Sequence, residues 1–338
     1  MNRGLETGLI LGSSKGTYSA LNSGLAGMSM TNKLNMLDPS TITDPKVKPT
    51  FFINGDNVVL LSGTVLNMPN LTAKNTPGEL LPWVSTAFEQ TAGTSFRPAY
   101  LKNYLNGRAV LSFTPARYII WSTLATSYAY ASTTPSVSGT GMTYMFVVKR
   151  KDPVPGTIVD ARDSAISNTT GDLLIEFDAQ GRILFSYYGG DSGGATLISG
   201  RVGEPGAGIC NDWSIVTVKC QLRKDGGEIP SDSSGPTIAK RYAMPVDNRI
   251  GSTSPINIYV NGVELQKTIT ANAFTNADFN NDDSFRILER QISIGNKGGG
   301  YVNGGSYIAA ALLIPAYISN GMQKRIENYF RYYYNQPF

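Results

Sequence analysis

Two carboxylates, Glu176 and Asp178, stand at alternate positions of an apolar run, the spacing that places neighbouring strand side chains on one face. Retaining hydrolysis of a glycosidic bond uses such a pair, with one carboxyl group as nucleophile and the other as acid/base. The positions where a further carboxylate would complete the set hold Gln180 and Gly181, and an amide cannot shuttle the proton. We therefore interpret residues 178–181 as a turn and Glu176 as an exposed strand residue, and we predict no catalytic residues.

The composition excludes further kinds of catalytic site. The 338 residues include no histidine, which removes Ser-His-Asp triads, Cys-His dyads and histidine metal sites. Cys210 and Cys220 are too few for a Cys₄ site. They flank a predicted strand that holds them too far apart for a disulfide, so both are expected to be reduced. The glycine runs at 298–300 and 304–305 lack the Lys-Ser/Thr of a phosphate-binding loop. These features favour a protein without enzymatic activity and without a bound cofactor.

Charge and hydropathy limit the kinds of partner that we expect the protein to bind. Lys plus Arg number 29 and Asp plus Glu 25, a net charge of +4, with no basic block. We therefore predict no nucleic-acid binding. The longest apolar stretch, residues 308–318, is interrupted by Pro315 and is too short to span a bilayer. The apolar run at residues 9–11 is too short for the core of a signal peptide. We expect no membrane insertion and synthesis in a cytoplasm.

Tyrosines beside glycine-rich loops are the candidates for ligand binding. Tyr187 and Tyr188 precede the loop that contains Asp191, and Tyr301 follows the glycine run at 298–300. Aromatic faces at such places stack on sugar rings, although tyrosine is equally common at protein interfaces. These four residues form the predicted ligand-binding set.

An acidic cluster follows at Asp278, Asn280, Asp282 and Asp283. Calcium prefers several carboxylate and amide oxygens close together, so these residues can hold Ca²⁺. The cluster lacks the period-two ligands, central glycine and terminal glutamate of an EF-hand, and a solvated loop is the alternative interpretation.

From about residue 51 the pattern is typical of β-structure. Short runs of Val, Ile, Phe and Tyr alternate with clusters of Gly, Asn, Asp and Pro. Asn261-Gly262 predicts a tight hairpin between residues 256–260 and 263–265, and residues 178–181 predict another between 173–177 and 182–188. Further strands are expected at residues 58–61, 109–113, 143–149, 213–222, 291–294 and 306–314.

The two ends of the chain differ from this pattern. Ser319 is a candidate N-cap, and apolar residues at three-to-four spacing predict an amphipathic helix over 319–334 whose remaining aromatics can serve an interface. Residues 1–54 are rich in Gly and Pro and carry regularly placed Leu, Met and Ile. We interpret them as an extended arm for assembly or anchoring, with a disordered leader as the alternative. Residues 55–338 are expected to form the folded domain.

The order of these segments resembles the concanavalin A-like, or laminin-G-like, jelly-roll domain over roughly residues 55–335. The resemblance rests on landmarks at Trp83, 90–91, 97–100, 106–113, 144–148, 213–218, 258–262, 294–296, 307–314 and 325–330. Ala310-Ala311 departs from it, because such domains often carry a glutamate before the apolar pair. The resemblance implies an all-β jelly-roll sandwich of two curved antiparallel sheets. It also implies frequent glycan binding and occurrence in extracellular and bacteriophage virion proteins.

These observations favour a non-enzymatic bacteriophage virion protein: a capsid decoration, collar, tail or fibre component. The arm would contact other virion proteins, the chain would form homo-oligomers, and sandwich loops would contact proteins or a cell-surface glycan. The first alternative is a bacterial glycan-binding lectin module, and the second is a carbohydrate-active enzyme. A fold does not determine function, so the site must decide.

Overall fold

The computed structural model describes residues 35–44, 47–49, 51–72, 87–89, 94–114, 117–121, 141–160, 172–189, 196–202, 210–221, 242–243, 256–265, 267–269, 284–285, 292–295, 305–314 and 316–335. Every strand pairing among them is antiparallel, and one α-helix closes the chain. The predicted all-β sandwich with a C-terminal helix is confirmed. Residues 1–34, which make up most of the predicted arm, lie outside the described part.

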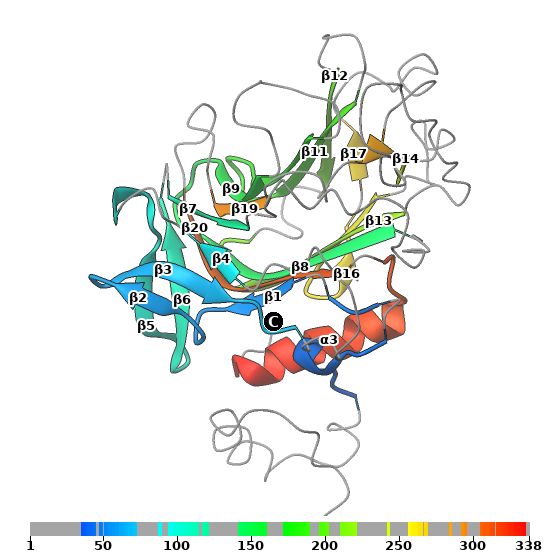
Figure 1. Ribbon diagram of the computed structural model, residues 1–338. Coiled ribbons are helices and arrows are strands. Elements are labelled where there is room, and N and C mark those ends of the chain that lie inside the picture. The colour runs from blue at the N-terminus through cyan, green and yellow to red at the C-terminus, as the bar shows by residue number, and fades with distance from the viewer. Residues whose placement is uncertain are drawn as a thin grey trace, which may run out of the picture.

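The strands form two layers of a sandwich (Figure 1). The first layer contains β1 (Phe51–Asn54), β5 (Ala99–Leu105), β6 (Arg108–Phe113), β8 (Gly141–Arg150), β13 (Ser214–Gln221), β15 (Ile256–Val260), β16 (Val263–Glu264) and β20 (Ser306–Ile314). The second contains β2 (Val59–Leu61), β3 (Thr64–Pro69), β4 (Ala87–Glu89), β7 (Tyr118–Trp121), β9 (Gly156–Asp160), β10 (Asp172–Phe177), β11 (Ile183–Gly189), β12 (Thr196–Val202), β17 (Lys267–Ile269) and β19 (Ile292–Gly295). The layers are joined at one side by the pairing of β3 with β5.

Three smaller kinds of element complete the described part. Strands β14 (Tyr242–Ala243) and β18 (Ser284–Phe285) pair with each other alone, apart from the main ladders. Two single 3₁₀ turns, η1 (Pro39–Thr41) and η2 (Thr94–Phe96), lie between strands or before them. The helix α3 (Asn320–Tyr333) packs on the outer face of the first layer, against β1, β8 and β20 (Figure 1). It is too short to cross a membrane, and no other helix in the described ranges is a candidate span.

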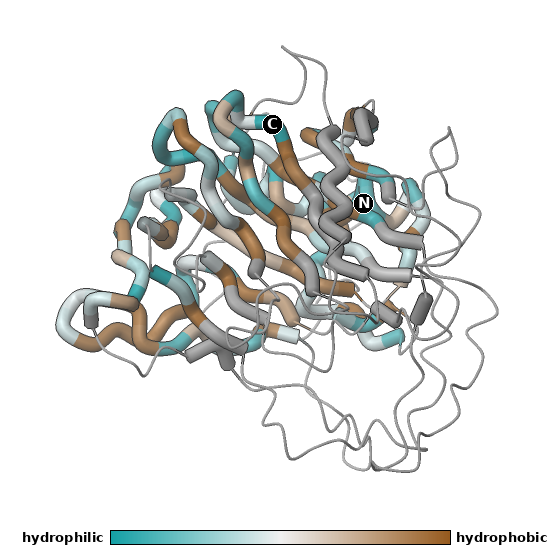
Figure 2. Tube along the Cα trace, turned by 90° about the horizontal axis from the view of Figure 1, so that it is seen from above, coloured by the Kyte–Doolittle hydropathy of each residue, from teal (hydrophilic) through white to brown (hydrophobic). Residues whose placement is uncertain are grey.

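Where α3 covers it, the first layer is buried on both faces, which explains why residues 144–148 of β8 and 308–314 of β20 are apolar without a break. In β8, Tyr144 and Phe146 point into the core between the sheets, whereas Met145 and Val147 point into a second core under α3. Strand side chains alternate between faces, so a strand covered on both sides needs an apolar residue at every position. Strand β20 follows the same rule. Hydrophobic residues therefore run along neighbouring strands of the sandwich (Figure 2).

The predicted hairpins at Asn261-Gly262 and at residues 178–181 are confirmed, and a further hairpin forms at Asn106-Gly107. Strands β15 and β16 pair across Asn261-Gly262, where φ is 55° and 84°. Strands β5 and β6 pair across Asn106-Gly107, with φ of 47° and 84°. Positive φ at both central residues is the type I′ geometry that fits strand twist, and Asn-Gly is the sequence that adopts it most readily. Residues 172–177 and 183–188 pair as expected in β10 and β11.

The helix and the segment before β1 form a third layer. Ser319 caps α3 by accepting a hydrogen bond from the backbone N–H of Met322, as expected. Residues 35–44 run along the helix, where the N–H of Leu37 donates to the carbonyl of Arg325 at 3.0 Å.

The expected boundary at residue 54 needs correction, because Phe51–Asn54 forms β1, which pairs with β20 inside the sandwich. The physical reason is that Phe51 and Ile53 fill the core between the sheets.

Candidate functional site

Three aromatic side chains meet on the outer face of the first layer, and we call Tyr104, Trp213 and Tyr307 the aromatic platform. The ring centroids of Tyr104 and Tyr307 lie 5.1 Å apart with an interplanar angle of 32°, and Trp213 lies 6.5 Å from Tyr104 and 6.4 Å from Tyr307. Tyr104 is 47% exposed and the other two are half-buried. The cluster therefore presents part of its aromatic surface to solvent, most of it from Tyr104.

Irregular backbone in β5 exposes Tyr104. The β5–β6 register shifts between Leu101 and Leu105, and Asn103 has a positive φ of 56°. Regular pairing would bury every second residue of this stretch, whereas residues 102–104 are all exposed. Just beyond them, the Asn106 amide donates to the carbonyls of Tyr334 and Asn335, so this turn is tied to the end of the chain.

The pairing of β8 with β13 and β20 places the other two rings. Tyr307 lies opposite Lys149 in the β20–β8 ladder. Trp213 lies immediately before β13, and Asp212 accepts a hydrogen bond from its backbone N–H at 2.8 Å. Because β8 pairs with both β13 and β20, residues far apart in the chain arrive at one place on the sheet.

Charged groups surround the platform. The Lys149 ammonium lies 3.3 Å from the Asp212 carboxylate, which is 90% exposed. The Lys151 ammonium lies 5.8 Å from the centroid of the Tyr307 ring and donates to the Ser112 hydroxyl at 3.3 Å. Burial, followed by the hydrogen bond with Tyr104, raises the pKa of Tyr307 to about 12. Its hydroxyl therefore stays protonated at neutral pH.

This arrangement suits binding. Flat aromatic faces stack on the apolar C–H face of a sugar, while ammonium, carboxylate and hydroxyl groups at the rim hydrogen-bond to its substituents.

The predicted ligand and metal residues fall mainly where the structure gives no description. Tyr187 and Tyr188 lie on β11, where their backbones pair with Ile198 and Leu197 of β12, but their rings are not described. The remaining members of both sets lie outside the described residues: Asp191, Tyr301, Asp278, Asn280, Asp282 and Asp283. Within the described ranges, no three His, Cys, Asp or Glu side chains gather as a metal site. The sugar-binding tyrosines and the calcium site stay predictions.

The hydrogen bonds of Asp178 show the role of one member of the Glu176 and Asp178 pair. Asp178 is buried and accepts from the backbone N–H groups of Gln180 and Arg182, each at 2.9 Å, and it pairs with the Arg182 guanidinium at 2.6 Å. These bonds close the β10–β11 turn, as expected for residues 178–181. Glu176, predicted to be exposed, is half-buried, because β10 is an inner strand of its layer that pairs with β9 and β11 and leaves its side chains between those of two neighbouring strands.

Cys210 is a buried, reduced thiol outside any disulfide, in agreement with the prediction for this cysteine. Burial raises its pKa to about 12, so the thiol stays protonated and unreactive at neutral pH. The side chain of Cys220 is not described.

The aromatic platform was not predicted from the sequence, because the sequence features that indicate it are weak. Trp213 and Tyr307 stand at the start of strong strand patterns, where an aromatic residue is ordinary. Tyr104 precedes the Asn106-Gly107 turn, and an aromatic residue two positions before such a turn is a hint of exposure at most.

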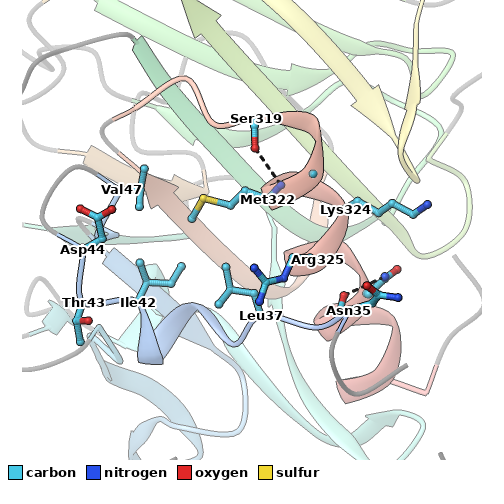
Figure 3. A pocket seen from close by; sticks show the side chains of 12 residues that line it. Asn35, Leu37, Ile42, Thr43, Asp44, Val47, Ser319, Met322, Lys324 and Arg325 are labelled. Atoms are coloured by element: carbon cyan, nitrogen blue, oxygen red, sulfur yellow. Dashed lines mark hydrogen bonds between the residues drawn. The ribbon is translucent and has the colours of Figure 1, made fainter. Parts of the chain in front are cut away.

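A separate cavity of about 730 Å³ lies between residues 35–47 and the first turns of α3 (Figure 3). Leu37, Ile42 and Met322 line it with apolar groups, and Asp44 and Arg325 stand among its polar lining. It is a seam between two packed segments of the chain, and it contains no pair of groups suited to acid/base or nucleophilic chemistry.

No protein-family model matches the chain, and no curated protein sequence matches it. Solved structures that it resembles include the binding domain of Paraclostridial Mosquitocidal Protein 1, at 10% identity and a TM-score of 0.45, over 85% of this chain and 53% of that one. Another is the receptor binding domain of botulinum neurotoxin D, at 11% identity and a TM-score of 0.41, over 79% of this chain and 53% of that one. The chain spans about half the length of these structures, and likeness at this level does not assign it to a family.

Proposed function

We propose that the protein is a non-enzymatic binding module that holds a glycan on the aromatic platform. The observation that carries this proposal is the tilted contact of the exposed Tyr104 ring with Tyr307 beside Trp213, with lysine and aspartate groups at the rim. Exposed aromatic clusters dominate recognition energetics because they bury large apolar area at a small entropic cost. Each single contact would be weak, and many copies on one surface would supply avidity.

The setting that we propose is a bacteriophage virion surface, where the module would serve as a decoration, collar, tail or fibre component. The support is the Gly- and Pro-rich segment that precedes the sandwich, which is suited to contacts with other virion proteins or with further copies of the chain. A bacterial lectin module is the alternative, and it shares the same platform. The two differ in the role of residues 1–34, which only the virion setting requires for assembly.

Substitution of the platform tests the binding function. Tyr104→Ala and Trp213→Ala each remove a ring that would stack on sugar, and we expect about a tenfold loss of affinity for each. Phe96→Ala is the matched control, because Phe96 is a 38% exposed aromatic residue that packs on Tyr118 instead. The measurement is binding of the full chain and its variants to a glycan array.

Three results of this experiment would count against the proposal. The unsubstituted chain could bind no glycan on the array. The platform variants could bind with the same affinity as the unsubstituted chain. Phe96→Ala could lose as much affinity as the platform variants do. Shortening of an arrayed polysaccharide by the chain would instead support a carbohydrate-active enzyme.

A further inference from the structure

Lys151 is built into the edge of the aromatic platform. Its backbone N–H donates to the carbonyl of Gly305 at 3.0 Å. A Cβ on Gly305 would lie 3.0 Å from Cδ of Lys151 and 2.2 Å from the carbonyl oxygen of Phe113, so the absence of a side chain there makes room for the lysine stem. The position of Lys151 is therefore set by packing and by the backbone.

The ammonium of Lys151 has a different environment from that of its neighbour. Lys149 forms an ion pair with Asp212. Lys151 instead donates to the neutral hydroxyl of Ser112, which is buried, and its ammonium lies over the Tyr307 ring. Among the described residues no carboxylate lies within ion-pair distance of it, although the charge of Asp152 is close enough to raise the pKa of Tyr307. An ammonium has three donors, and one protein acceptor leaves the others for a ligand.

We infer that the platform selects an acidic sugar, a glycan residue that carries a carboxylate, with that carboxylate paired to Lys151. This inference rests on the proposed glycan-binding function and specifies its ligand class. A sugar ring seated on the exposed Tyr104 ring lies next to Tyr307, and the Lys151 ammonium is 5.8 Å from the centroid of the Tyr307 ring. An exocyclic carboxylate of that sugar is thereby brought to the cation, and charge-assisted hydrogen bonds are the stronger kind.

Asp212 completes the recognition of such a ligand. Its carboxylate is 90% exposed beside Trp213 and is free to accept sugar hydroxyl protons on its outer side. The rim therefore offers an acceptor at Asp212 and an anion-binding donor at Lys151, with the aromatic faces of the platform alongside them. A neutral sugar would use the rings and Asp212 and leave Lys151 without a matching charge.

The test compares acidic oligosaccharides with their own neutral forms. Hyaluronan and oligogalacturonate fragments and sialylated glycans are arrayed beside the same compounds after reduction of the carboxyl group to a hydroxymethyl group. The full chain is expected to bind at least one acidic form about tenfold more tightly than its reduced form. In Lys151→Met, which keeps the aliphatic stem and removes the charge, that difference should disappear.

Lys324→Met is the matched control, because it makes the same change of net charge on the exposed face of α3, beside the cavity of Figure 3 and away from the platform. It should leave the tenfold difference intact. Equal binding of acidic and reduced forms by the unsubstituted chain would overturn the acidic-sugar inference and leave the glycan-binding proposal standing. Binding of neither form by the unsubstituted chain would overturn both.

Discussion

At the scale of single residues, a buried carboxylate joins the helix to the sandwich. Glu327 of α3 is 1% exposed; its Oε1 accepts from the Thr217 hydroxyl at 3.2 Å and from the Gln323 amide at 2.8 Å, and its Oε2 lies 3.6 Å from the Arg331 guanidinium. Arg331 also donates to the carbonyl of Asn261 in the β15–β16 turn at 2.9 Å. A buried charge is tolerated only when it is paired and hydrogen-bonded, so this site requires accurate docking of the turn.

Gly262 next to that carboxylate provides a sharp test. A Cβ at Gly262 would lie 2.7 Å from Oε2 of Glu327, whereas a Cβ at Gly107 would meet no atom within 4 Å, and both residues have φ of +84°. Gly107→Ala should therefore lower the free energy of unfolding by about 1–2 kcal/mol, the conformational cost alone. Gly262→Ala should cost about 1–3 kcal/mol more, because it also disturbs the buried charge. Urea unfolding of both variants measures the difference, and equal losses would contradict this role of Glu327.

At the scale of elements, α3 is held at both ends by different means. Near its start, the fully buried Lys219 of β13 donates to Oδ1 of Asn320 at 2.6 Å and to the carbonyl of Ile318 at 3.4 Å. Just past its end, the Tyr334 hydroxyl donates to the carbonyl of Ala309 in β20 at 2.8 Å. Along its outer side, residues 35–44 and Val47 add apolar contacts that include buried Ile42. The segment before β1 is therefore part of the folded unit from residue 35 onward.

Two truncations distinguish the packing role of residues 35–50 from a role of residues 1–34 in assembly. Deletion of residues 1–34 should leave the free energy of unfolding nearly unchanged, because every contact of the second core among the described residues remains. Deletion of residues 1–50 should lower it by about 3 kcal/mol or more, because Ile42 and its partly buried neighbours Leu37 and Val47 leave the helix. Thermal or urea unfolding tests this pair, and equal stability of the two would contradict the packing. In the proposed virion setting, the shorter deletion should also abolish incorporation into particles, and incorporation that survived would refute that role.

At the scale of the whole molecule, the interface between α3 and the first layer of the sandwich is rich in tyrosine. Burial raises the pKa values of Tyr329 and Tyr334 well above the usual value, and it raises that of Tyr333, whose hydroxyl donates to Asp56. These hydroxyls stay protonated in the folded state at pH values where the unfolded chain loses its protons. The folded protein then binds more protons than the unfolded one, so stability falls as pH rises.

Stability should accordingly be level near neutral pH and decline above about pH 10, as the unfolded tyrosines ionise. Cys210, with a pKa raised to about 12, acts in the same direction from about pH 9. Burial lowers the pKa of Lys219, so this residue makes stability rise with pH, but it is one group against several tyrosines. The melting temperature between pH 7 and 11.5, measured together with tyrosine absorbance at alkaline pH, checks this. A melting temperature that did not fall by pH 11.5 would contradict the burial of these tyrosines.

The sequence alone determined the features that depend on neighbouring residues. Asn106-Gly107 and Asn261-Gly262 specify their turns because only a few residue types accept positive φ. The spacing of apolar residues after Ser319 specifies the helix, since its period matches one buried face. The unbroken apolar strands indicate a sandwich, although they do not reveal that a helix and residues 35–47 cover the second face.

Only the tertiary structure decided where the candidate site lies. Tyr104, Trp213 and Tyr307 come from distant parts of the chain, and their meeting depends on the register of β8 with β13 and β20. Register is set by packing across the whole sheet and by irregular backbone such as that at Asn103, and neither is encoded in a short window of sequence. The same long-range pairing placed Phe51–Asn54 in the sandwich, because a strand is defined by its partner, here β20, as much as by its own residues.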